Sequence, residues 1–149
     1  MLETIKNAIR EIKLNEINSV TLKNQEIKQC FIYTDKVDDG ITDLKQTYEI
    51  KTANIVFDFR IEFDLGLNSF IIKLIPVEFN ADYQTNKNLK SYIDEYNTGF
   101  GDFRDYRLEI TTTKQFYKQV LIESVDMIRL IIQKAHNNAG ELIMECEND

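Results

Sequence analysis

The run NIVFDFRIEFD, residues 54–64, gives the clearest secondary-structure signal in the sequence, because hydrophobic and polar side chains alternate along it. The hydrophobic set is Ile55, Phe57, Phe59, Ile61 and Phe63, and the intervening positions are Val56, Asp58, Arg60, Glu62 and Asp64. A period of two is the pattern of a half-buried β-strand. The run therefore predicts a strand with one face in the core and the other mostly exposed to solvent.

The next hydrophobic run predicts the partner of this strand. A short connection, LGLN at 65–68, leads to SFIIKLIPVEF at 69–79, where both faces are apolar between Phe70 and Ile75. A connection of this length favours an antiparallel hairpin, and apolar residues on both faces favour a more buried strand. Pro76 has no N–H for a strand ladder, so the strand is expected to bulge, end or lie at an edge there.

The segments before residue 54 read as one helix followed by strands. Residues 2–13 place Leu2, Ile5, Ala8, Ile9 and Ile12 at helical spacing between charged residues, which predicts an amphipathic helix. Residues 19–23 and 27–34 are rich in β-branched and aromatic side chains, which favours two short strands. Residues 35–43, DKVDDGITD, are expected to form an exposed loop, and residues 44–52 fit a helix or a strand equally well.

The segments after residue 79 predict a helix, a strand and a long final helix. The helix is expected at 85–96 and the strand at 104–111. Thr112 and Gln115 fit a capping box that opens the final helix, and the run HNNAG at 136–140 is expected to end it. The hydrophobic stripe of this helix is Phe116, Val120, Leu121, Val125, Ile128, Ile131, Ile132 and Ala135.

Together these segments predict an α+β fold. The expected architecture is a largely antiparallel sheet with the N-terminal helix and the long C-terminal helix packed on one face. The chain of 149 residues fits a single domain over 1–149. Its last residues, 140–149, form an acidic tail that is expected to be a last turn or frayed.

The net charge of −7 restricts the partners of the protein. An acidic chain is a poor binder of nucleic acid and of anionic membranes, and its charge favours a basic protein partner or, as the alternative, serves solubility alone. The sequence shows neither a secretory signal nor a run of apolar residues long enough to cross a membrane, so we expect a cytoplasmic protein. Cys30 lies in an apolar run and Cys146 in the polar tail, which predicts neither a disulfide framework nor a metal-binding pair.

The sequence offers little basis for catalysis. The only histidine, His136, lies in the expected last turn of the final helix and has no nucleophile motif to serve. The acidic loops lack calcium-ligand spacing, and no phosphate-binding glycine motif is present. Asp58, Glu62 and Asp64 share a strand face that could bind Mg²⁺, but with Arg60 among them cross-strand ion pairs are favoured. We therefore expect no enzyme, no cofactor and no metal site.

One stretch, EYNTGFGDFRDYR at 95–107, combines aromatic side chains, carboxylates and arginines around two glycines. Tyr, Phe and Arg dominate the binding energy of many protein interfaces. The stretch is therefore interpreted as a docking surface, with a purely structural turn as the alternative. The predicted partner-binding residues are Tyr96, Phe100, Asp102, Phe103, Arg104 and Asp105, together with Asp38 and Asp39 of the acidic loop.

A small acidic protein without a catalytic constellation has the profile of an inhibitor or immunity protein. Such a protein neutralises a basic toxin, for example a nuclease domain, or another enzyme, by occluding its active site. The alternative is a self-associating scaffold, chaperone or phage structural subunit, a homo-oligomer that uses strand 69–79 as its contact. A third hypothesis is an enzyme with a carboxylate-based or metal-assisted site.

Overall fold

The computed structural model describes residues 1–33, 40–53, 55–79, 102–104 and 107–148. Its helices and strands, in chain order, are α1 (Leu2–Arg10), β1 (Ile17–Gln29), the 3-10 turn η1 (Phe31–Tyr33), β2 (Ile41–Thr52), β3 (Ile55–Asp64), β4 (Ser69–Phe79), β5 (Asp102–Arg104), β6 (Arg107–Thr112) and α3 (Tyr117–Asn148).

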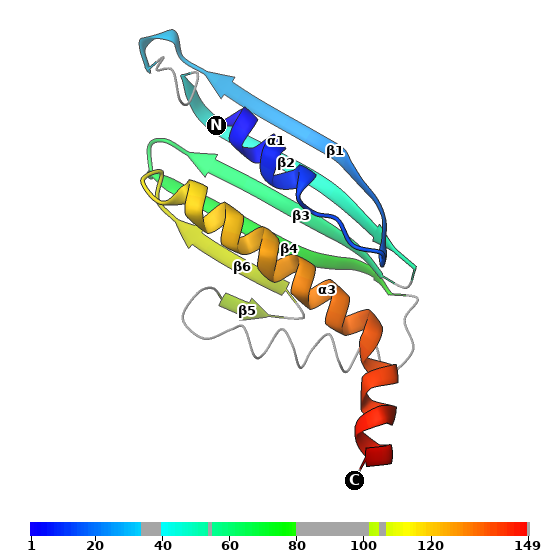
Figure 1. The fold of residues 1–149 in the computed structure, drawn as a ribbon. Helices are drawn as coiled ribbons and strands as arrows, with labels where there is room; N and C mark the ends of the chain where they lie inside the picture. The colour runs from blue at the N-terminus through cyan, green and yellow to red at the C-terminus, as the bar shows by residue number, and fades with distance from the viewer. Residues whose placement is uncertain (34–39, 54, 80–101, 105–106, 149) are drawn as a thin grey trace.

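The strands form one antiparallel sheet in the order β1-β2-β3-β4-β6-β5. Helices α1 and α3 cover the same face of this sheet, α1 over β1 and β2 and α3 over β4 and β6 (Figure 1). The α+β class and the one-sided helix packing predicted from the sequence are thus confirmed.

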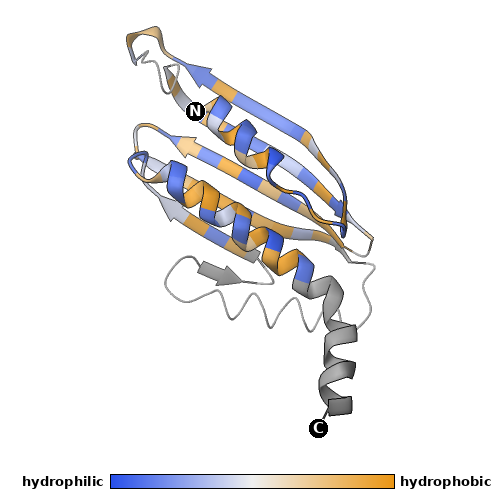
Figure 2. Cartoon of the chain, viewed as in Figure 1, coloured by the Kyte–Doolittle hydropathy of each residue, from blue (hydrophilic) through white to orange (hydrophobic). Residues whose placement is uncertain are grey.

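The alternation in β3 sets the two faces of the sheet. Phe57, Phe59 and Ile61 are fully buried under the helices, and the even-numbered residues of β2 and β4 that lie opposite them in the register share this face. We call the other side, which no described helix covers, the open face. Figure 2 shows the alternation of hydrophobic and hydrophilic residues along the strands, and it shows β1 as a mostly hydrophilic strand.

An aromatic stack ties the hairpin of β3 and β4 to the final helix. The ring centroids of Phe63 and Phe70, which are opposite each other in the register, are 4.6 Å apart. The ring of Phe70 also stacks on Tyr117 at the start of α3, with 4.5 Å between centroids and 6° between planes. Large flat side chains at these three positions therefore fix the helix on the sheet.

The hairpin forms as the sequence predicts, including the irregularity at Pro76. Phe57 pairs with Pro76 and Val56 with Glu78, so one residue of β4 is left over between them. This bulge places the residue that lacks an N–H where the ladder is already interrupted. The turn itself contains Asn68 with φ of 47°, and its Oδ1 accepts a hydrogen bond from the backbone N–H of Lys114 at 3.2 Å.

Two predictions before residue 54 are corrected, and one that the sequence left open is decided. Residues 19–23 and 27–34 are not two strands, because β1 runs continuously from Ile17 to Gln29 and ends there. The expected loop at 35–43 ends earlier, because β2 begins at Ile41. Residues 44–52, which fitted a helix or a strand, belong to β2 and pair on both sides.

Helix α3 differs from its prediction at both ends. Thr112 is the last residue of β6, so the helix begins at Tyr117 rather than at the expected capping box. The helix also continues through residues 136–140 to Asn148, and Figure 1 shows its last turns extending past the sheet. Asn and Gly cost only up to about 1 kcal/mol each in a helix, and no proline follows them. His136 is consequently not in a closing turn.

The hydrophobic stripe of α3 packs as predicted except at Phe116, and the side chain of Ala135 lies outside the described part of the chain. Leu121, Val125, Ile128, Ile131 and Ile132 are buried, and Val120 is partly buried. Phe116 is exposed because it precedes the helix. The predicted helix at 85–96 lies outside the described residues.

Candidate protein-binding surface

Three consecutive large side chains project from the connection between β1 and β2. Phe31 is 94% exposed, Ile32 87% and Tyr33 59%. Large apolar side chains with this exposure, adjacent in the chain, form a patch of the kind that marks an interaction site.

The backbone explains why these residues are not a continuation of β1. The N–H of Cys30 donates to the carbonyl of Gly40 at 2.8 Å and closes the hairpin, and the N–H of Tyr33 donates to the carbonyl of Cys30 at 3.1 Å. Gly40 adopts a φ of 70°, which favours glycine. The chain therefore turns away after Gln29, and Phe31, Ile32 and Tyr33 lie beyond the end of the sheet, where no strand lies beside them.

Two other connections lie at the same end of the sheet. In an antiparallel sheet alternate connections share an end, and here Asp43 of β2 pairs with Asp64 of β3. The N–H of Leu65 donates to the carbonyl of Thr42 at 2.9 Å. The turn that follows exposes Leu67, and the connection after β6 exposes Phe116. Neighbouring strands are about 4.8 Å apart, so these connections line one short edge of the sheet.

We define the sheet-end surface as Phe31, Ile32, Tyr33, Leu67 and Phe116. The other large hydrophobic residues exposed within the described part of the chain are Leu22, Val77 and Ile122. Five of the eight thus lie on connections at one end of the sheet, which makes that end the most apolar part of the described surface.

A hollow lined by three carboxylates and one lysine adjoins the sheet-end surface. Its volume is about 200 Å³, and Leu67 and Ile71 line it together with Asp43, Lys45, Glu62, Asp64 and Ser69. Asp43 and Asp64 are directly opposite each other in the register, and within the described residues neither forms an ion pair. Asp64 instead accepts a hydrogen bond from the N–H of Leu67 at 3.2 Å. The apolar surface therefore has a negatively charged flank.

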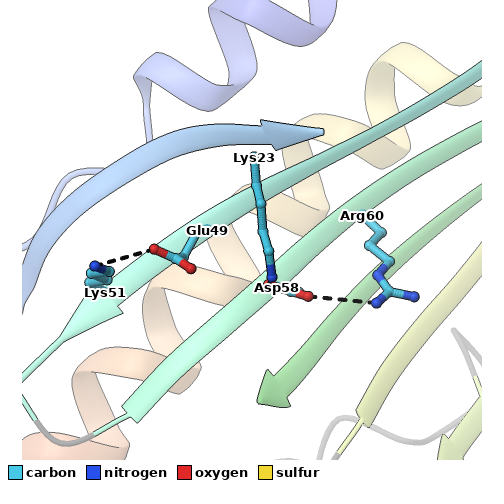
Figure 3. A network of polar contacts seen from close by, with 5 residues as sticks. All are labelled: Lys23, Glu49, Lys51, Asp58 and Arg60. Carbon is cyan, nitrogen blue, oxygen red and sulfur yellow. Dashed lines mark hydrogen bonds and ion pairs between the residues drawn. The ribbon is translucent and has the colours of Figure 1, made fainter. Parts of the chain in front are cut away.

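Ion pairs occupy the middle of the open face (Figure 3). Asp58 is 3% exposed, with Lys23 Nζ 3.4 Å from its Oδ1 and an Arg60 guanidinium nitrogen 3.6 Å from its Oδ2. Lys73 lies 3.8 Å from Glu62. The pairs Lys23–Asp58 and Lys73–Glu62 are cross-strand, as predicted from the sequence, whereas Asp58 and Arg60 pair within β3. Within the described residues, no group of three or more His, Cys, Asp or Glu side chains is placed to hold a metal ion.

A second group of polar side chains, linked by hydrogen bonds, lies on the helix side of the sheet. The hydroxyl of Tyr48 donates to Gln46 Oε1 at 3.1 Å, and Gln46 Nε2 donates to Gln25 Oε1 at 2.6 Å. Burial raises the pKa of the Tyr48 hydroxyl. These hydrogen bonds satisfy the buried polar groups and join β1 to β2.

The predicted partner-binding residues are not brought together by the described structure. Asp38, Asp39, Tyr96, Phe100 and Asp105 lie outside the described residues. Asp102, Phe103 and Arg104 form β5, which pairs with β6 at the edge of the sheet, and their side chains lie outside the described part. The docking interpretation of 95–107 therefore stays a prediction.

Sequence reasoning missed Phe31, Ile32, Tyr33 and Leu67. The first three were assigned to a strand because they continue an apolar run, and the point where that strand ends depends on its pairing with β2. For Leu67 a signal was present, since an apolar residue in a four-residue connection between two paired strands has little room to be buried.

The comparisons add no relative to this description. No family model matches the chain, and no curated protein or solved structure is significantly similar to it. No helix of the described residues is both long and apolar enough to cross a membrane.

Proposed function

We propose that this protein is a protein-binding inhibitor of the immunity type, which occludes the active site of a basic enzyme or toxin and contacts it through the sheet-end surface. The observation that carries the proposal is the exposure of three consecutive large side chains, Phe31, Ile32 and Tyr33, at the end of the sheet. Aromatic and aliphatic side chains that leave water together supply most of the energy of a protein interface.

Charge supports a basic partner. The chain carries a net charge of −7, and Asp43 and Asp64 lie beside the apolar side chains without an ion-pair partner among the described residues. Carboxylates at the rim of an apolar contact accelerate and orient the approach of a positively charged surface. An enzyme that acts on an anionic substrate has such a surface around its active site.

The turn between β3 and β4 is held in place by hydrogen bonds, which suits a contact surface. The turn at Leu67 is held by Asp64 and by the hydrogen bond from Lys114 to Asn68. Little ordering of these groups is then required on binding, which lowers the entropic cost of association.

The test is capture of partners from a lysate of the source cells by three tagged proteins. They are the wild type, the double variant Phe31→Ser/Ile32→Ser, and a control, Val77→Ser, which changes an exposed apolar residue toward the other end of β4. We expect one stoichiometric basic protein with the wild type and the control, and its loss with the double variant. The captured protein is then purified and assayed for its own activity.

Addition of the purified wild type should abolish that activity, and the double variant should not. A partner retained by the double variant would contradict the assigned surface. A partner that remains fully active in the complex would contradict occlusion.

A further inference from the structure

The outer edge of β1 is unusually long for an edge strand. β1 has 13 residues and is the first strand in the sheet order, so only β2 pairs with it among the described strands. Figure 1 shows it as the outermost strand on its side of the sheet. An exposed edge presents a row of backbone N–H and C=O groups that can pair with another strand.

One stretch of this edge is regular enough to act as such a template. The pairing with β2 is irregular at Asn18 and at Lys23, where β1 carries one extra residue, and after Lys28, where β2 carries the extra residue Thr42. From Asn24 to Lys28 each residue of β1 pairs with one residue of β2 in unbroken register. Bulges protect an edge by twisting it, so residues 24–28, the longest stretch of β1 without a bulge, are the part most open to another strand.

The side chains of this part are complementary to themselves. Glu26 and Lys28 lie two residues apart on the open face, and Ile27 lies between them on the helix side. Glu26 and Lys28 are exposed, and neither forms an ion pair with another described residue. When two such strands meet antiparallel about a two-fold axis at Ile27, Glu26 of each copy is opposite Lys28 of the other.

We infer that two copies of this chain associate through their β1 edges, antiparallel and centred on Ile27. The two sheets then continue into one, and two Glu–Lys pairs form across the axis on one face. Side chains of opposite charge that face each other across two strands stabilise a sheet. Because of the two-fold axis, the contact between Glu26 of one copy and Lys28 of the other occurs twice in the interface. The helix sides of the two sheets also lie on the same side of the joined sheet, since Ile27 is opposite Ile27 of the other copy on that side.

An exposed apolar residue also supports a second copy of the chain as the partner of this edge. Continuing the pairing toward the start of β1 brings Leu22, which is 50% exposed, toward turn η1 of the other copy. The inference does not depend on the proposed function. It also differs from self-association through strand 69–79, because β4 pairs with both β3 and β6 along residues 70–74.

A charge exchange tests the pairing. Sedimentation velocity of the full chain, up to millimolar concentration, is measured for the wild type, Glu26→Lys, Lys28→Glu and the double exchange. Each single change replaces two attractive pairs by two repulsive ones, so we expect the dimer dissociation constant to rise by about tenfold or more. The double exchange restores both pairs and should restore the dimer.

Matched controls are Glu3→Lys and Lys6→Glu, which alter the net charge equally on the exposed side of α1. Circular dichroism of every variant checks the fold, since Glu26 and Lys28 also lie opposite Lys45 and Asp43 within the chain. A wild type that stays monomeric, single variants that associate like the wild type, or a double exchange that does not recover association would each overturn the inference.

A cysteine pair tests the register itself. In a Cys30→Ser/Cys146→Ser background, Ile27→Cys should form a disulfide between copies under mild oxidation. Leu22→Cys, on the same edge but away from the axis, should not. Cross-linking of Leu22→Cys alone would overturn a two-fold axis at Ile27.

Discussion

Lys23 and Asp58 are joined although their strands are not neighbours: Lys23 Nζ lies 3.4 Å from Asp58 Oδ1, while β2 separates β1 from β3. The reach is explained by the bulge, since Lys23 is the extra residue of β1 between Leu22 and Asn24. Its long side chain crosses the open face over β2. Asp58 is consequently shielded from water by a residue 35 positions earlier in the chain.

We expect the two ends of this ion pair to contribute unequally to stability. Asp58→Ala removes the shared acceptor of Lys23 and Arg60 and should lower the free energy of unfolding by about 1–3 kcal/mol. Lys23→Ala should cost less than about 1 kcal/mol, because the lysine is half exposed and Arg60 still pairs with Asp58. Urea unfolding of both variants measures the difference, and equal losses would contradict this account.

Phe70 should be among the residues most sensitive to substitution. It is buried and stacks on both Phe63 and Tyr117, so Phe70→Ala should cost about 3–5 kcal/mol. Phe31→Ala is the matched control, because the same substitution at an exposed ring should change the unfolding free energy by less than about 0.5 kcal/mol. A large loss at Phe31 would show that its side chain packs within the protein.

Tyr48 should make the fold sensitive to alkaline pH. Its folded-state pKa is raised by burial, so its neutral form contributes stability that is complete below the unfolded value of about 10 and is lost as the pH rises above it. Tyr48→Phe should flatten the alkaline fall in the urea midpoint. At neutral pH it should cost about 1 kcal/mol, since Gln46 loses a donor. Tyr33→Phe, at a side chain that is 59% exposed, is the matched control substitution.

Asn68 should tolerate glycine better than alanine. Its φ of 47° is unfavourable for alanine, and its side chain also accepts the hydrogen bond from Lys114. Asn68→Ala loses both contributions and should cost about 1–2 kcal/mol. Asn68→Gly loses only the hydrogen bond. Thermal unfolding that ranks glycine below alanine would contradict a conformational role for this residue.

The parts of the fold that follow from short-range patterns were predictable. The alternation in 54–64 defined β3, and the four-residue connection to 69–79 defined its hairpin partner. Helix α1 followed from the spacing of Ile5, Ala8 and Ile12. In each case a residue and its immediate neighbours in the chain determine the outcome.

The parts that depend on distant pairing were not predictable. Phe31 continues an apolar run, and only the register with β2 decides that the strand ends before it. Asn24 and Gln25 interrupt the β-favouring pattern of β1, yet an edge strand accepts polar residues on both faces. The pairing of Asp58 with Lys23 depends on a bulge in β1, which brings together residues of strands that are not neighbours. The candidate surface was missed for the first of these reasons.

The β3–β4 hairpin also has a kinetic consequence. Its two strands are joined by a connection of only four residues, and its rings form the aromatic stack with Tyr117. Contacts between residues close in sequence form fastest, because little chain entropy is lost in closing the loop. Folding should therefore nucleate at this hairpin, with the exposed edge strand β1 ordering late. Substitutions at Phe63 should slow refolding, whereas substitutions along β1 should chiefly accelerate unfolding.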